Sequence, residues 1–144
     1  MSNAQVARLL PTGISLLVGL VSLRMALKGL SAKAWLPFHQ AAAEVDWNSL
    51  PLRLRLLLLF MVRMAGLGFL ALFLLLATIP VYVARHPDPF VALTNFGIAT
   101  TYCVGLGILT RWLHRETGAC TPWKESFAAA GVLVLASALY VVTL

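Results

Sequence analysis

Residues 52–85 read LRLRLLLLFMVRMAGLGFLALFLLLATIPVYVAR, an apolar run with arginines at both ends. About 20 helical residues cross a bilayer core of roughly 30 Å, so this run is longer than one membrane span. Arg63 divides it, because a helix from Arg63 to Arg85 rises roughly 33 Å and can place one guanidinium group at each edge of the hydrocarbon. Residues 52–62 then extend beyond that edge. Their apolar side chains need a cover of membrane surface, of the preceding loop or of another protein.

The composition of the whole chain is typical of an integral membrane protein. Of its 144 residues 60% are hydrophobic and only 11% are charged, too few to cover the surface of a soluble core, and the mean hydropathy is +0.89. The apolar residues fall in four blocks of membrane-crossing length. We therefore predict an all-α fold, a single transmembrane domain over residues 1–144, built as a four-helix bundle with a partly interfacial first loop. The expected helices cover about 8–28, 52–84, 89–115 and 122–144.

The net charge of +6 is distributed as a topology signal rather than as a nucleic-acid-binding surface. Arg8 and Arg85 lie on one expected side of the membrane, and Arg63 lies at its edge. The other basic residues lie on the opposite side, which the positive-inside rule makes cytoplasmic: Arg24, Lys28, Lys33, Arg53, Arg55, Arg111, Arg115 and Lys124. This predicts a bacterial-type inner membrane location, with both termini outside and loops 29–51 and 116–121 in the cytoplasm.

Small residues recur along two of the expected helices at spacings of three and four, which places them on one face of each helix. Small side chains let helix backbones approach closely in a membrane, where no hydrophobic effect drives association between helices. We therefore expect helix packing at two small faces, one formed by Ser15, Gly19 and Ser22 and the other by Thr94, Gly97, Thr101 and Gly105.

The long first loop carries tryptophans and a short alanine-rich stretch, 41–45, which predicts a helical turn or two lying flat in the membrane interface. His39, Glu44 and Asp46 are not spaced as metal ligands on a helix. They are expected to be solvated or ion-paired, with Arg53 and Arg55 as the partners. The remaining local predictions are free thiols at Cys103 and Cys120, an N-cap at Asp88, a helix end at Gly118 and an N-cap at Thr121.

Reactive groups are missing from the expected spans. No Asp or Glu falls within one, which disfavours proton- or cation-coupled transport, and every histidine lies outside them, which disfavours a membrane haem. The sequence has no paired-carboxylate site, no Ser-His-Asp arrangement at plausible depth, no Gly-rich phosphate loop and no CxxC pair. We expect no catalytic residues, no metal and no cofactor.

A basic rim that carries tryptophans remains as the candidate binding surface, and its partners would be membrane lipids, anionic ones included, other membrane subunits or a second copy of the chain. The first hypothesis is a non-enzymatic auxiliary or scaffolding subunit of a larger membrane complex. The alternatives are a homo-oligomeric channel, flippase or exporter for an anionic or apolar substrate, and an interfacial lipid-modifying enzyme using His39, Glu44 or Asp46. The rim residues chosen are Arg53, Arg55, Arg63, Trp35, Trp47 and Trp123.

Overall fold

The computed structural model describes residues 3–143, with side chains described from residue 9 onward. The fold is all-α, as predicted, and within the described residues four helices are long and apolar enough to cross a membrane. The predicted end of the last helix at Leu144 lies outside the described residues. In chain order the elements are α1 (Asn3–Leu30), α2 (Pro37–Ala43), the short 3-10 helix η1 (Trp47–Ser49), α3 (Leu52–Arg85), α4 (Pro89–Thr117) and α5 (Trp123–Val142).

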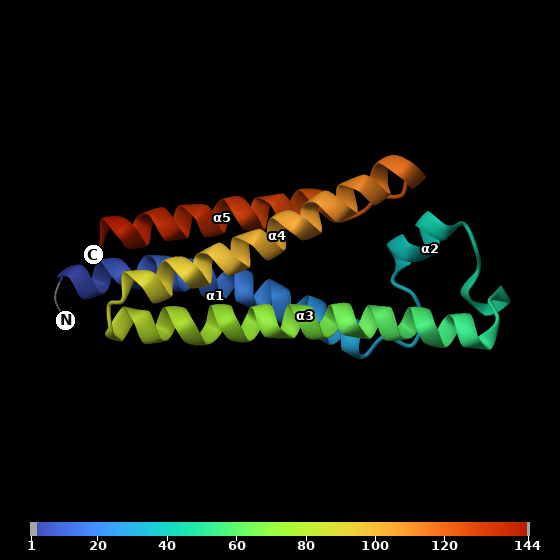
Figure 1. The fold of residues 1–144 in the computed structure, drawn as a ribbon, viewed down its shortest axis with the longest axis horizontal. Helices are drawn as coiled ribbons and strands as arrows, with labels where there is room; N and C mark the ends of the chain where they lie inside the picture. Colours follow the sequence, from blue (N-terminus) through green and yellow to red (C-terminus); the bar gives the residue numbers. More distant parts are fainter. Residues whose placement is uncertain (1–2, 144) are drawn as a thin grey trace.

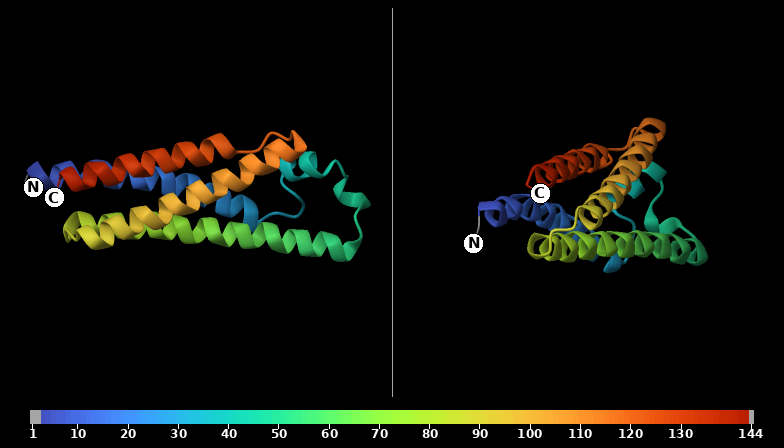
Figure 2. Two further views of the ribbon diagram at one scale, coloured as in Figure 1. Left: turned by 45° about the horizontal axis from the view of Figure 1, so that its top comes forward. Right: turned by 60° about the vertical axis from the view of Figure 1, so that its left-hand side comes forward.

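The four long helices form two pairs that diverge like the arms of a V (Figure 1). Helix α1 packs along α3, and α4 packs along α5. The pairs meet where α1 begins, α5 ends and α3 turns into α4, which we call the closed end. They separate toward the other end, the open end, where α2 and η1 lie between α3 and the last turns of α4 (Figure 2).

One residue of the predicted small face of α1, Gly19, lies against α3, where an added Cβ would be 3.4 Å from Leu76 Cβ and 3.6 Å from Phe73 Cδ2. Ser15, Gly19 and Ser22 are buried, and both serine hydroxyls donate to carbonyls of their own helix, Pro11 O at 2.8 Å and Val18 O at 3.0 Å. The hydroxyls therefore add no bond between the helices. At the open end the backbones touch, since a Cβ added to Gly66 would lie 2.9 Å from Leu30 N and 3.1 Å from Gly29 C. Two glycines thus set this close approach.

The α4–α5 pair uses a different face of α4 from the one predicted. Gly107 lies under the ring of Phe127, whose atoms would stand 3.1 Å from an added Cβ. Ala99, Cys103 and Leu133 are buried in the core. The predicted stripe lies on another side of the helix: Thr94, Gly97 and Thr101 are exposed, Gly105 is half-buried, and neither glycine has an atom within 4 Å of an added Cβ. Packing at that stripe stays a prediction that only a partner chain can test.

The helix ends follow the predicted caps with one exception. Asp88 Oδ1 accepts a hydrogen bond from Val91 N at 3.1 Å, and Gly118 ends α4 in the left-handed conformation, at φ 68°, which favours glycine. The cap expected at Thr121 is wrong. Its hydroxyl instead donates to Thr110 O of α4 at 2.7 Å, because Pro122 and not Thr121 is the residue that precedes α5.

The first turns of α3 project beyond α1. Since α1 ends beside Val62 and Gly66, residues 52–61 run on for about three turns without it. Val62 is buried, and α2 and the adjoining loop partly cover one side. The opposite side is uncovered by the described residues, with Leu56 and Phe60 each more than half exposed.

Candidate binding cavity at the open end

The divergence of the two helix pairs leaves a cavity of about 300 Å³ at the open end. Every membrane-spanning helix or its adjoining turn contributes to the lining, and α2 closes the side toward the loops. The lining side chains are almost all aliphatic or aromatic: Met25 from α1; Leu36, Phe38 and His39 from α2 and its start; Val62, Ala65 and Phe69 from α3; Leu106, Leu109, Thr110, Trp112 and Leu113 from α4; and Pro122 before α5.

Two further cavities flank α2 and share lining residues with the first. One, of about 500 Å³, shares His39, Val62, Ala65 and Leu113 with the first cavity and adds Trp35. The other, of about 530 Å³, shares Met25, Leu36, Phe38 and Pro122, and its mouth carries Lys28, Cys120 and Glu125. The apolar space therefore extends on both sides of α2, and this short helix fills only part of it.

His39 and Thr110 are the two residues that bring hydrogen-bonding side chains to the wall of the 300 Å³ cavity, apart from the indole N–H of Trp112. The Thr110 hydroxyl is already used, because it donates to Leu106 O at 2.7 Å. The His39 ring packs on Phe38 with 4.0 Å between centroids, and its Nδ1 is enclosed with no hydrogen-bond partner within the described residues. Burial lowers the pKa of His39 below its ordinary value of 6.5, so the ring is neutral at neutral pH.

The three arginines predicted for the basic rim, Arg53, Arg55 and Arg63, all lie on α3. None of them lines the 300 Å³ cavity. The Arg63 guanidinium is exposed and donates through Nη2 to Ala32 O at 3.4 Å, a long bond to a carbonyl just beyond the end of α1, where a cation also suits the helix dipole. Arg53 is exposed. Arg55 is half-buried, and its Nε is enclosed without a partner among the described residues.

The predicted tryptophans fall into two groups at different places in the fold. Trp35 and Trp47 meet edge to face at 5.6 Å and fasten the start of α2 to η1. Trp123 stands in the first turn of α5, with Arg111 Cζ and Lys124 Nζ over its ring at 5.4 and 5.5 Å. The expected single rim is therefore two surfaces, one on α3 and the loop and one at the tip of α4 and α5.

Of the trio His39, Glu44 and Asp46, the two carboxylates are exposed, as predicted, whereas His39 is half-buried. Asp46 Oδ2 accepts from Asn48 N at 3.1 Å and so caps η1, and Glu44 ends α2 in the left-handed conformation. His39 turns toward the cavities rather than to solvent. The sequence signal that could have revealed this is the placement of His39 directly after Pro37 and Phe38, which puts the imidazole in the first turn of an amphipathic helix.

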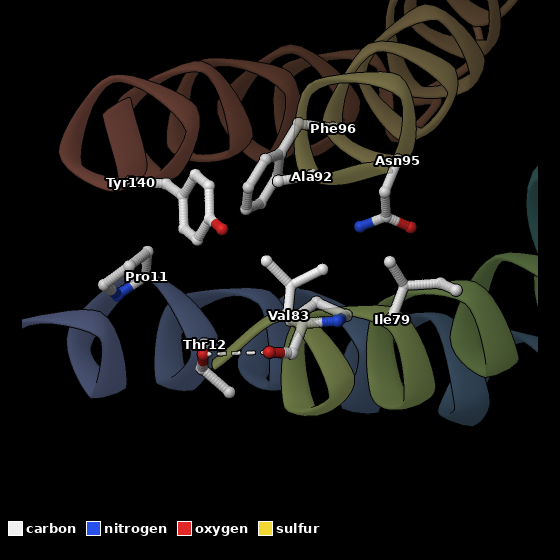
Figure 3. Close-up of a pocket in the computed structure, with 9 residues that line it drawn as sticks. Pro11, Thr12, Ile79, Val83, Ala92, Asn95, Phe96 and Tyr140 are labelled. Carbon is white, nitrogen blue, oxygen red and sulfur yellow. Dashed lines mark hydrogen bonds between the residues drawn. The ribbon is translucent and has the colours of Figure 1, made fainter. Parts of the chain in front are cut away.

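At the closed end the described residues enclose a much smaller space. Figure 3 shows Tyr140, Phe96, Asn95 and Val83 around a space of about 10 Å³, room for about one water molecule. The Thr12 hydroxyl donates to Pro80 O at 3.3 Å, and Asn95, only 3% exposed, has its Oδ1 without a partner among the described residues. The bundle is thus packed at one end and hollow at the other.

Comparison with protein-family models, curated proteins and solved structures found no match to this chain. The fold and the cavity themselves define a multi-pass helical membrane protein, four spans of which diverge around an apolar space at one end.

Proposed function

We propose that this protein is a non-enzymatic membrane protein that binds the apolar chain of a lipid in the cavity at the open end, and that the open end faces the cytoplasm. The observation that carries the proposal is the 300 Å³ cavity with its aliphatic and aromatic lining. Small-molecule sites in proteins have volumes of about 300–1,000 Å³ and a predominantly apolar wall with few polar groups. A hollow of this kind inside a membrane is most readily filled by a hydrocarbon chain.

The chemistry near the cavity supports binding rather than catalysis. Its wall carries no carboxylate and no cysteine, and its one histidine is not joined by a second titratable group there. The lipid-modifying alternative would need His39 to work with Glu44 or Asp46, but Asp46 already caps η1. A transport path through a single copy is disfavoured by the packing of the closed end, where Leu76 and Val83 are almost fully buried.

A role as an auxiliary subunit has support from a separate observation, the uncovered side of residues 52–62. Leu56 and Phe60 are 58% and 59% exposed and lie one helical turn apart. The exposed stripe of Thr94, Gly97 and Thr101 offers a second face for a neighbouring membrane helix. Under this proposal lipid binding and attachment to another subunit use different surfaces of the same protein.

The test places a large side chain from α3 in the cavity. Ala65 lines two of the three cavities, and Ala65→Trp is expected to displace a bound chain without disturbing helix packing, because Ala65 is exposed. Ala71→Trp is the matched control, an equally exposed alanine on the same helix that lines none of the three cavities. Native mass spectrometry of protein extracted from its membrane should show bound lipid on the wild type and on Ala71→Trp, and much less on Ala65→Trp.

Equal lipid occupancy in all three proteins would contradict the proposal, since bound lipid would then lie on the outer surface of the helices. Wild-type protein that carries no lipid at all, and takes none up from added vesicles, would contradict it as well.

A further inference from the structure

We propose that the ligand of the open-end cavity is a neutral amphiphile, one whose head group is an ester or hydroxyl that hydrogen-bonds to the His39 imidazole, rather than a phospholipid with an anionic head. This inference rests on the proposed function and names the class of lipid that the cavity would take.

The His39 imidazole is placed where a ligand can reach it. It lines both the 300 Å³ cavity and the 500 Å³ cavity beside it, so it lies at the junction of the two spaces. Its Nδ1 has almost no accessible surface, whereas Nε2 is not enclosed, so a ligand in either cavity would meet the ring at Nε2.

The walls of these two cavities contain no charged side chain to receive an anion. Their lining residues are apolar or aromatic except for His39 and Thr110, and the Thr110 hydroxyl is bonded within α4. A phosphate drawn into this space would lose its hydration without gaining a counter-charge, which is far more costly than the transfer of an ester or a hydroxyl.

None of the nearby cations lines either of the two cavities that share His39. Arg63 bonds the carbonyl of Ala32, and Arg111 and Lys124 lie over the ring of Trp123. Lys28 lines the third cavity, on the other side of α2, where Glu125 shares the wall and would repel an anionic head. The basic residues therefore surround the open end without entering the space that a lipid chain would fill.

A neutral imidazole presents either a donor or an acceptor at Nε2, according to its tautomer, and either one suits an uncharged head. An ester carbonyl can accept from Nε2–H, and a free hydroxyl can donate to Nε2 in the other tautomer. A diacylglycerol offers both groups next to two apolar chains. The chains would lie along Phe69 and Leu106, deeper in the V, and the head would remain at α2.

The experiment compares two probes that differ only in the head group, a diacylglycerol and a phosphatidylglycerol with the same brominated chains, added to the full-length protein in uncharged detergent micelles. Bromine quenches tryptophan emission on contact, and Trp35 and Trp112 line the cavities. The wild type is expected to bind the diacylglycerol roughly tenfold more tightly than the phosphatidylglycerol. His39→Phe should lose roughly tenfold in diacylglycerol affinity, as the loss of a hydrogen bond with a buried partner predicts.

Two variants separate the hydrogen bond from the shape of α2. His39→Gln keeps a donor and an acceptor and is expected to retain the preference for the neutral probe. Gln40→Ala changes the exposed neighbour of His39 and should leave both affinities unchanged. Thermal melting of each variant shows whether the fold is retained.

The outcomes distinguish this inference from the proposed function. If both probes bind equally, Ala65→Trp abolishes binding and His39→Phe has no effect, the cavity binds lipid but the neutral-head inference is wrong. Tighter binding of the phosphatidylglycerol would overturn the inference in the same way. If neither probe binds, or Ala65→Trp leaves binding intact, the proposed function itself fails.

Discussion

Gly29 and Gly66 bring the backbones of α1 and α3 into contact, and we predict that neither accepts a larger side chain. A Cβ on Gly66 would stand 2.9 Å from Leu30 N, a backbone atom that cannot move aside as a flexible side chain would. Gly66→Leu should therefore destabilise the bundle by about 1–3 kcal/mol or more, measured as a lower midpoint of unfolding in mixed detergent. Gly97→Leu is the control, because nothing lies within 4 Å of a Cβ there. Equal losses in both variants would refute this account of the helix contact.

The protonation state of His39 gives a second prediction at the scale of one residue. Burial lowers the pKa of His39, so the folded protein favours the neutral ring. The stabilisation that depends on the neutral ring is complete above the ordinary pKa of 6.5 and is lost as the pH falls through the lowered pKa. No charged side chain lines the two cavities that share His39. Because the ligand binds the neutral ring of the folded protein, affinity for the brominated diacylglycerol should fall as the pH is lowered through that pKa, which lies below 6.5.

The same pH titration of His39→Phe is expected to be flat, because the variant has no titrating ring at the cavity. A parallel fall in both proteins would assign the pH effect to another group.

At the scale of the elements, the first turns of α3 have one side, the side of Leu56 and Phe60, that the described residues leave uncovered. Leu56→Lys combined with Phe60→Lys adds charge to that side only, because both residues are more than half exposed. The double variant should keep the wild-type unfolding midpoint within about 1 kcal/mol, whereas Leu76→Ala, at a fully buried site, should lose about 2–5 kcal/mol. Detergent unfolding monitored by circular dichroism measures both changes.

The same double variant tests what covers this side of α3. Affinity purification at native expression levels should recover any subunit that binds this face with the wild type and not with the variant. If the variant unfolds in detergent, this side of α3 is covered by its own chain. The assignment of the side to a partner is then wrong.

At the scale of the whole molecule, labelling of the two cysteines can show which side of the membrane the open end faces. Cys120 is exposed at the mouth of the open end, and Cys103 is buried in the α4–α5 core. A membrane-impermeant maleimide should label the protein in inverted vesicles and not in intact cells, with Cys120→Ser abolishing the label. Cys103 should react only after unfolding. Labelling of intact cells would place the open end outside, opposite to the charge-based prediction.

The lengths and positions of the helices could be predicted from the sequence because they depend on local quantities. Each span is a run of apolar residues long enough to cross a bilayer, and the ends at Asp88 and Gly118 follow from the chemistry of the cap residues themselves. Ser15, Gly19 and Ser22, which form the single small stripe of α1, are all buried.

The choice of contact face on α4 could not be read in the same way. Gly97, Thr101 and Gly105 form one small stripe, and Ala99, Cys103 and Gly107 form another, on a different side of the helix. Spacing alone does not rank the two, because in a membrane both lipid and another helix can cover a small apolar face. Packing against Phe127 selected the stripe that contains Gly107.

By itself the sequence determined four membrane-crossing helices, their order and the position of their acidic residues near the helix ends, because hydrophobic length and charge belong to each segment separately. Only the tertiary structure decided that the helix pairs diverge, that α2 enters the gap and that His39 meets an apolar cavity. Those features depend on the crossing of helices far apart in the chain, and the crossing is set by which side chains are small enough at each point of contact.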